Sequence, residues 1–452
     1  MSEVQQVEKF EILPSNLPSD GKYSFSQGNP IVQFNIASVP KLLRTSSLRV
    51  NGTISVLQAD KTPVDNLALK GGTATSISMN SRVGVNSVFQ NVNIASSESN
   101  QTLESVRQYP RLISSVLPSV QSEEDFMNHS GVTSKSTAVG DVTDVMCNND
   151  MSFSVQLFAG VFQSSPALSL GVNGVRGLNI SLELSPDSQV LKTAVADTGA
   201  TYVLSDLSIS GDMLVGDMLM SKLGVAASGE MVFNSFSSLY SVINSSDSTS
   251  TFNLASSNVL SVIHNFIPPT HINSYASDGM STDMLKNRDQ TGNYAKAVTL
   301  RKTSFSRGGL KLKLDYDLES EAQSSQSIPE TGVQIQALNA LQPYHSLTKM
   351  LNQPQLFPYG TKDGVISSDV SGPGDGILHS APQKLTSVDP ERNFCVGLAM
   401  DRLSGQGINF RGQSYALRLQ TDLDGNSPMA VYTYALSRNV LSYSPAGIFV
   451  SS

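Results

Sequence analysis

The chain has 452 residues, which is enough for about three average domains or two large all-β ones. Its 30 basic and 38 acidic residues give a net charge of −8, and it has no block of five or six like charges, so direct neutralisation of nucleic-acid phosphates is disfavoured. Charged residues make up only 15% and apolar residues 39%, which excludes disorder driven by charge and allows a packed core.

The sequence pattern predicts neither a targeting signal nor a membrane segment. The first thirty residues carry acids and no apolar core, so no secretory signal is expected. The uncharged window Met151–Val175 contains serines, glutamines, an asparagine and a proline, and is not a membrane span. Cys147 and Cys395 are too few for a disulfide framework and are interpreted as small buried residues. The chain is expected to be made and kept in a reducing compartment.

Apolar and polar residues alternate with a period of two along the chain, which predicts half-buried strands of antiparallel sheets. In chain order the clearest cases are Leu48–Val56, Phe153–Leu157, Leu310–Leu314 and Leu417–Leu419. In the first of these, Asn51-Gly52 has the composition of a type I′ turn and predicts a hairpin. In the third, Gly308-Gly309 predicts a turn, followed by three leucines on one buried face.

Helical periodicity is confined to two segments, Leu103–Leu117 and Gln336–Leu351. Each has a proline near its centre, Pro110 or Pro343, so both helices are expected to be short or broken. The bulk of the chain is therefore predicted to be all-β.

Four short patterns recur in the same order at separations near half the chain length. The pairs are Phe34–Ser38 with Phe252–Ser256, Leu103–Val116 with Leu338–Leu351, Phe153–Leu157 with Phe394–Leu398, and Tyr202–Leu204 with Tyr434–Leu436. In the second pair, Tyr109 and Tyr344 are expected to be buried on short helical segments, each with a bonded hydroxyl. Four ordered matches predict a duplicated β-domain.

Each predicted copy has about 200 residues, some eight strands, long loops and one or two short helices, which is typical of a jelly roll. The sequence thus predicts two tandem eight-stranded jelly rolls with short helices in the loops. The expected boundaries are an N-terminal arm over 1–20, a first jelly roll over 21–222 and a second over 223–452. The Met- and Leu-rich segment Met213–Leu223 is expected to cross from one copy to the other.

Two stretches of the chain resemble double jelly-roll major capsid proteins. Gly84–Val92, followed by Leu103-Glu104 and Tyr109, is similar to their first half. Tyr432–Leu436 through Tyr443–Ile448 is similar to their closing strand. Within that family, the chain resembles the capsid proteins of polinton-like viruses and virophages, in the PRD1–adenovirus lineage. The likeness extends over the layout of the whole chain.

This resemblance implies a structural role without enzymatic activity or cofactors. Such a protein is expected to form a homotrimer, whose six jelly rolls make a pseudo-hexameric capsomer of an icosahedral virus shell. The implied partners are neighbouring capsomers and the minor capsid and penton proteins, with no sequence-specific binding to nucleic acid. The implied location is the virion, after synthesis in the host cell without a signal peptide.

A duplicated β-barrel could also be a bicupin-like metalloenzyme, which requires an HxH pattern with further ligands downstream. The five histidines are His129, His264, His271, His345 and His379. None of them stands in an HxH, HExxH or Cys-His spacing, so no metal site is predicted. The histidines are interpreted as loop or interface residues.

Other chemical patterns are equally incomplete. Asp422–Asn426 lacks the remaining ligands of a calcium loop and is interpreted as a hairpin turn. Gly372–Gly376 lacks the Lys-Ser/Thr of a phosphate loop. The acidic run 123–125 is interpreted as a solvated face, and no G-x-S-x-G elbow occurs. The sequence therefore predicts no catalytic, cofactor-binding or metal-binding residue, and no enzyme.

A glycan-binding or adhesive β-sandwich is the remaining alternative to a capsid protein. Sugars usually stack on exposed aromatic rings, but Trp is absent here and aromatic residues make up only 7%. N-x-S/T sequons begin at Asn51, Asn100, Asn128, Asn179 and Asn244. A chain this rich in Ser and Thr is expected to contain several by chance, and no glycosylation is predicted.

Overall fold

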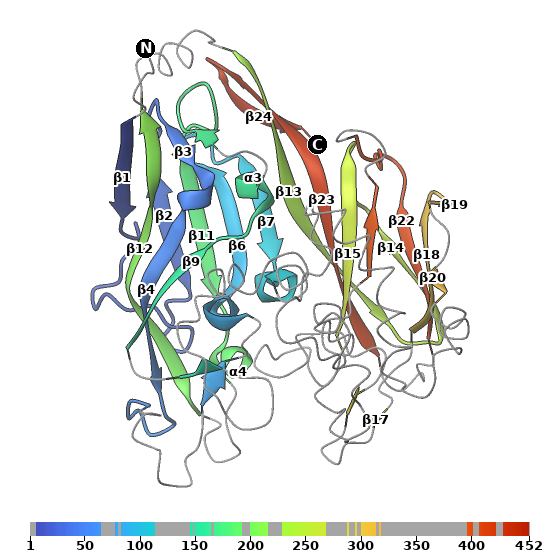
Figure 1. Cartoon of the computed structure of the whole chain (residues 1–452), viewed down its shortest axis with the longest axis horizontal. Coiled ribbons are helices and arrows are strands. Elements are labelled where there is room, and N and C mark those ends of the chain that lie inside the picture. The colour runs from blue at the N-terminus through green and yellow to red at the C-terminus, as the bar shows by residue number, and fades with distance from the viewer. Residues whose placement is uncertain are drawn as a thin grey trace, which may run out of the picture. The chain divides into compact units, whose positions relative to one another are not determined.

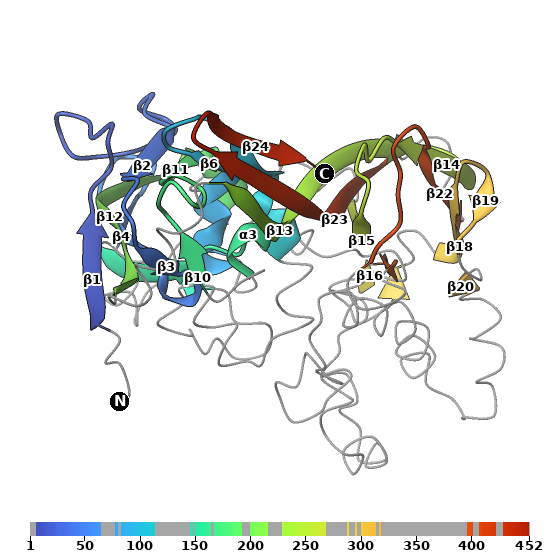
Figure 2. The same cartoon turned by 90° about the horizontal axis from the view of Figure 1, so that it is seen from above.

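The structure of the protein is a computed structural model, shown in Figure 1 and, seen from above, in Figure 2. The structure describes residues 6–64, 77–79, 83–113, 145–147, 150–163, 167–191, 199–215, 228–267, 287–288, 294–295, 300–312, 316–317, 396–400, 406–421 and 428–451.

The chain divides into two compact units. The first comprises Met1–Pro110, Met127–Ser237 and Leu436–Ser452, and the second comprises Arg111–Phe126 and Ser238–Ala435. Two long strands, β13 (Gly229–Ile243) and β23 (Met429–Ser444), contribute residues to both units. These units are compact groups of residues and do not define where each jelly roll begins or ends. The predicted jelly-roll boundaries after residues 20 and 222 therefore stay predictions.

The first unit contains two sheets. One sheet has the order β10-β3-β12-β4-β9, with β1 also paired to β12. Its strands are β1 (Gln6–Ile12), β3 (Leu42–Arg44), β4 (Arg49–Leu57), β9 (Met151–Gln156), β10 (Ala167–Ser169) and β12 (Thr201–Val215). Because β1 pairs with β12 along its whole length, the predicted arm over 1–20 includes a strand of this sheet.

The other sheet of the first unit runs β2-β11-β6-β7 and continues through β13 and β23 to β24. Its remaining strands are β2 (Ile31–Ile36), β6 (Phe89–Ser96), β7 (Thr102–Arg107), β11 (Leu178–Leu184) and β24 (Gly447–Ser451). Alternate residues, such as Phe34, Ile94 and Ile180, are completely buried. The period-two pattern therefore places one face of each strand in the core.

Short elements connect these strands. They are the 3₁₀-helices η1 (Thr45–Ser47) and η2 (Gly84–Val88), the helices α3 (Gly160–Gln163) and α4 (Asp187–Val190), and the ladder of β5 (Ser78–Met79) with β8 (Val145–Met146). Within the described ranges, no helix is both long enough and apolar enough to cross a membrane.

The second unit has a sheet in the order β14-β22-β18-β19, with β20 also paired to β18. The strands of this sheet are β14 (Asp247–Phe252), β18 (Leu300–Arg307), β19 (Leu310–Lys311), β20 (Tyr316–Asp317) and β22 (Tyr415–Thr421). The remaining strands of the unit are β15 (Val259–Ile267) and β21 (Val396–Ala399), which pair with each other beside β23, and the ladder of β16 (Asn287–Arg288) with β17 (Tyr294–Ala295).

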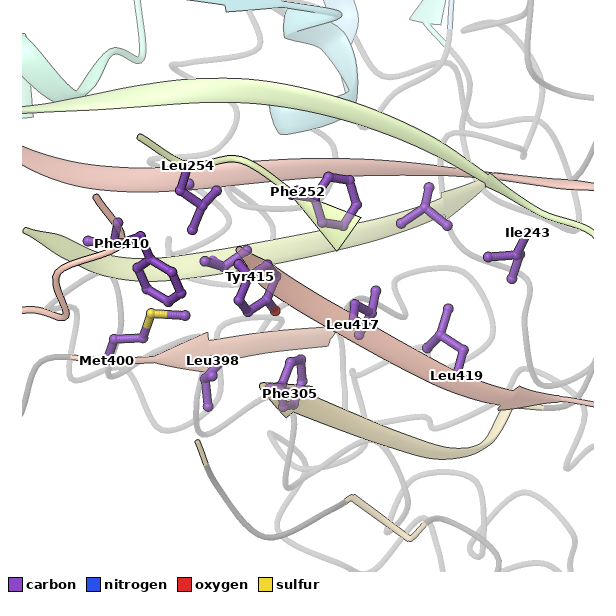
Figure 3. Packing of buried hydrophobic residues seen from close by; sticks show 14 of the residues in the cluster. Ile243, Phe252, Leu254, Phe305, Leu398, Met400, Phe410, Tyr415, Leu417 and Leu419 are labelled. Atoms are coloured by element: carbon purple, nitrogen blue, oxygen red, sulfur yellow. The ribbon is translucent and has the colours of Figure 1, made fainter. Parts of the chain in front are cut away.

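The core of the second unit is built from the inward-facing residues of these strands, and Figure 3 shows it from close by. Phe305, Tyr415 and Leu417 are completely buried, and Phe252 and Leu398 nearly so. Aromatic rings dominate its centre, and Phe410 meets the ring of Tyr415 edge-on, with centroids 5.9 Å apart.

The predicted hairpin at Asn51-Gly52 is wrong, because both residues lie inside the continuous strand β4. Asn51 Nδ2 donates to Ser210 Oγ at 2.8 Å, which is a cross-strand bond to β12. A Cβ on Gly52 would lie 2.5 Å from Leu207 Cδ2 and 3.0 Å from the ring of Phe153. Glycine here lets the side chains of Leu207 and Phe153 pack closely on the strand and does not form a turn.

The predicted helix Leu103–Leu117 is wrong at its start, because residues 102–107 form strand β7. The pairing of β6 with β7 shifts at Leu103, so this extra residue and Glu104 are both buried. The bulge thus leaves Leu103 and Val106 both buried, three residues apart, which is the spacing of buried residues in a helix. Helix begins only at Tyr109, where Pro110 falls in the first turn and its missing N–H costs nothing.

The strand predicted over Leu310–Leu314 is partly confirmed. Gly308 and Gly309 have φ of 52° and 85° and form the expected turn before β19. Leu310 is 76% exposed, however, and only Leu312 packs against the core of the second unit. A leucine at a hairpin tip has no facing sheet to cover it, so alternation alone misassigned its burial. Residues 313–314 lie outside the described residues, as does the predicted helix Gln336–Leu351.

The close packing at Gly52 leads to a prediction. Gly52→Ala should lower the free energy of unfolding by about 1–3 kcal/mol, because the added methyl group would displace Leu207 or Phe153. Thr53→Ala, one residue further along β4, adds no atom and should cost less. Urea denaturation followed by far-UV circular dichroism compares the two variants. Equal stability of Gly52→Ala and the wild type would contradict the packing described here.

Candidate functional site

Among the described residues, no three His, Cys, Asp or Glu side chains lie close enough together to hold a metal ion. Cys147 is buried, as predicted. The other candidates of the sequence analysis that lie outside the described residues are His129, His271, His345, His379, Cys395, residues 123–125, residues 372–376 and residues 422–426. The prediction that the chain has no catalytic, cofactor-binding or metal-binding residue stays a prediction.

His264 is completely buried on β15, so its interpretation as a loop or interface residue is wrong. Its Nε2 lies 2.6 Å from the hydroxyl of Tyr415, and its Nδ1 lies 2.9 Å from the hydroxyl of Thr433. The imidazole therefore joins β15 to β22 and β23. Its ring centroid lies 6.0 Å from that of Phe305 and 6.3 Å from that of Phe252. Polar contacts at the ring edge are thus enclosed by aromatic faces.

This environment keeps His264 neutral. Burial lowers its pKa to about 3, because a cation in this core would lose its hydration without gaining a counter-ion. A neutral imidazole has one donor and one acceptor nitrogen, and the two hydroxyls can take either role. Both nitrogens of His264 are therefore bonded to protein hydroxyls, and the side chain is buried within the second unit.

The first unit contains a buried carboxylate for which sequence analysis predicted no role. Glu104 on β7 is 2% exposed. Its Oε1 accepts hydrogen bonds from the backbone N–H groups of Gly160 at 2.9 Å and Phe236 at 2.8 Å. Its Oε2 accepts a third from Val161 at 2.9 Å. One side chain therefore connects β7 to the first residues of α3 and to β13.

Burial raises the pKa of Glu104 to about 7, although its three N–H donors act in the opposite direction. Desolvation disfavours the charged form more strongly than the donors favour it. The local sequence gives one signal for this residue, since a single acid among Leu103, Val106 and other buried positions of a strand requires a partner. The partners themselves come from segments 56 and 132 residues away, which no local pattern reveals.

The segment that Glu104 holds is fixed by further contacts. Tyr109 is completely buried, and its hydroxyl accepts a hydrogen bond from Phe158 N–H at 2.8 Å, which confirms the prediction for this tyrosine. The rings of Phe158 and Phe236 have centroids 5.7 Å apart. A Cβ on Gly160 would lie 2.9 Å from the carbonyl oxygen of Asn234, so α3 and β13 meet backbone to backbone. The predicted counterpart, Tyr344, lies outside the described residues.

Large apolar side chains remain exposed at several places on the two units. The set consists of Val7, Leu13, Leu17, Phe25, Ile31, Val172, Val232, Tyr240, Val242, Leu310 and Phe449. Phe449 is 65% exposed at the centre of β24, in which no residue is buried. Among the sequons, Asn51 is engaged within the sheet, whereas Asn100 and Asn244 are exposed.

No family model matches this chain, and no curated protein matches it either. Solved structures match it over nearly its whole length. The PBCV-1 virus capsid has a TM-score of 0.57 at 12% identity, covering 100% of this chain and 98% of the other. The Faustovirus major capsid protein has a TM-score of 0.57 at 8% identity, covering 98% and 91%. The Sputnik virophage structure has a TM-score of 0.52 at 10% identity, covering 100% and 89%.

The chain has the double jelly-roll fold. The predicted all-β class and the predicted resemblance to double jelly-roll major capsid proteins are thereby confirmed at the level of the fold. At 8–12% identity, the matches show a shared architecture and assign no role to individual side chains such as Glu104 and His264.

The buried imidazole predicts a loss of stability in acid. Below pH 6.5 the unfolded chain binds a proton at His264 while the folded chain does not, so stability falls as the pH decreases toward 3. The full effect is about 5 kcal/mol at about 1.4 kcal/mol per pH unit. Relative to the wild type, His264→Gln should gain stability as the pH falls from 6.5 to 4, because it removes this contribution. Tyr415→Phe, which removes a hydrogen bond but leaves the imidazole, should keep the pH dependence of the wild type. Urea midpoints across this range measure both, and equal slopes for wild type and His264→Gln would refute the role of this histidine.

The buried carboxylate predicts the opposite dependence. Glu104 keeps its proton in the folded chain up to about pH 7, whereas the unfolded chain loses it near pH 4.5, so stability falls as the pH rises through this interval. The contribution is about 3 kcal/mol. Glu104→Gln should remove this slope, and should cost about 1–3 kcal/mol at pH 5 because an amide has one acceptor oxygen for three N–H groups. Exposed Glu230→Gln is the matched control and should change neither quantity in urea unfolding at pH 5 and pH 8.

Proposed function

We propose that this chain is a structural major capsid protein that forms homotrimers and, through them, the shell of an icosahedral virus. The observation that carries the proposal is the match of fold along the full chain to the capsid of PBCV-1 and to the Faustovirus major capsid protein. Each match covers nearly all of both chains. The likeness therefore includes the duplication and is not limited to a single domain.

The duplication gives a mechanism for tiling. A sixfold position in a shell needs six similar units around one axis, and three chains with two jelly rolls each supply them. The trimer then acts as a pseudo-hexameric capsomer. Each chain would contact the next through a heterologous interface that closes into a ring of three. Permanent interfaces of this kind commonly bury more than about 2,000 Å².

The proposal excludes enzymatic activity and cofactors. It is supported by the two buried titratable groups, His264 and Glu104, whose polar atoms are occupied by protein partners rather than directed at solvent. Neighbouring capsomers and minor capsid and penton proteins are the proposed partners, and the virion is the proposed location.

Sedimentation of the purified protein tests this function. A trimer of the 48.3 kDa chain, or closed particles built from it, is expected at micromolar concentration. Because a permanent interface does not dissociate on dilution, the trimer should persist over a wide concentration range. Electron microscopy should show pseudo-hexagonal blocks. A monodisperse monomer at high concentration would overturn the proposal.

A further inference from the structure

Strand β24 forms an edge of its sheet in the first unit. It pairs with β23 through Val440–Ser451, Leu441–Val450, Ser442–Phe449, Tyr443–Ile448 and Ser444–Gly447, and Figure 2 shows the two strands side by side. No other strand among the described residues pairs with β24. Alternate residues of an antiparallel edge strand direct their N–H and C=O groups away from the neighbour, so β24 presents free hydrogen-bonding groups to solvent.

Two other edge strands of the first unit, β1 and β2, are protected against pairing. β1 carries Glu8, Lys9 and Glu11, and charges within an edge strand oppose the approach of another strand. The edge of β2 is covered by the preceding segment. Ser15 N–H donates to Gln33 O at 2.7 Å, and Asn16 Nδ2 donates to Ile31 O at 2.8 Å.

β24 has neither kind of protection. Its residues, Gly447–Ser451, include no charge and no proline, and the turn that leads into it, Pro445-Ala446, is also uncharged. Its central residue is Phe449, with about two thirds of its side chain in solvent. An uncharged edge with an exposed aromatic residue is a typical site for the addition of a strand.

The charge of the chain indicates which strand would be added. Copies that each carry a net charge of −8 repel one another, and this repulsion is weakest where neither surface carries charge. A second copy of β24 meets that condition. Antiparallel pairing of two identical strands about a twofold axis also makes a closed, isologous contact.

We propose that β24 pairs antiparallel with β24 of a second copy, with Phe449 opposite Phe449 of the partner subunit at the twofold axis. This inference rests on the proposed function and extends it. A closed trimer uses its heterologous contacts internally, so a shell needs a second class of contact to join one trimer to the next. The β24 pair supplies it, and it places two aromatic rings next to each other across the new strand pair.

Two substitutions test the proposal on the full-length protein. Phe449→Glu places two like charges opposite each other at the axis, so shells should be lost while trimers persist. Leu310→Glu makes the same change at an exposed leucine of the second unit and should leave both trimers and shells unaffected. Sedimentation velocity and electron microscopy separate the two assembly states.

Cross-linking tests the register. Cα atoms of directly opposite residues lie within the range that a disulfide spans, so Phe449→Cys should give chain pairs on a non-reducing gel after mild oxidation. Leu310→Cys and the wild type, which retains Cys147 and Cys395, should not. At least a tenfold excess of chain pairs in Phe449→Cys over both controls is expected.

Three outcomes overturn the inference, and a fourth overturns only the proposed function. If Phe449→Glu forms shells in the same yield as the wild type, β24 is not required for shell formation. If Phe449→Glu no longer forms trimers, β24 belongs to the contacts within the trimer. If the thiol introduced by Phe449→Cys is protected from alkylation in shells but does not cross-link, another occupant, such as a lipid surface or a different protein, covers β24. If the wild type forms no trimer but Phe449→Cys still cross-links, the proposed function fails while the β24 pair remains.

Discussion

The three hydrogen bonds to the Glu104 carboxyl group hold β7, α3 and β13 of the first unit together. β7 and β13 pair in parallel at a single position, Ser105 with Ser237, so few ladder bonds join these strands. The side chain of Glu104 supplies a substitute by accepting the N–H of Phe236, and its other two bonds hold the start of α3 against the same strand. Leaving even one of these buried N–H groups unpaired would cost about 1–3 kcal/mol. Since β13 continues into the second unit after Ser237, the anchor acts on a strand that has residues in both units.

The two units contain buried titratable groups of opposite character. In the first, Glu104 has a raised pKa and destabilises the fold as the pH rises toward 7. In the second, His264 has a lowered pKa and destabilises the fold as the pH falls below 6.5. Between about pH 4.5 and 6.5 the two effects oppose each other, so together they lower the stability least in this mildly acidic interval. Both groups are buried, so salt should screen them far less than it screens an exposed pair such as Arg418 with Asp247.

Sequence patterns predicted the class of fold because alternation reports which face of a strand is buried, and the four ordered matches reported the duplication. They failed where a long-range contact decides the structure. Asn51-Gly52 has the composition of a turn, yet a cross-strand bond and the close approach of Leu207 keep it inside β4. Leu103 and Val106 are both buried at a spacing of three residues, as in a helix, only because a bulge adds a residue to β7. The partners of Glu104 and His264 lie 56 to 169 residues away and could not be found from local spacing.

The low charge content of the chain also determines how its surfaces are organised. On β4, β9 and β12, the amide of Asn51 donates to Ser210 and accepts from Ser154 at 2.7 Å, so neighbouring strands are joined by neutral side chains. Such bonds hold their geometry without ion pairs, and they vary little with salt or pH. They also leave no unbalanced charge when an identical surface approaches. A protein that must pack against many copies of itself benefits from this property, because every buried charge would otherwise need a partner in the neighbouring copy. Under the proposed function, the serine-rich composition and the lack of chemical motifs have one explanation, since an assembly surface of this kind requires shape and neutral hydrogen bonds rather than reactive groups.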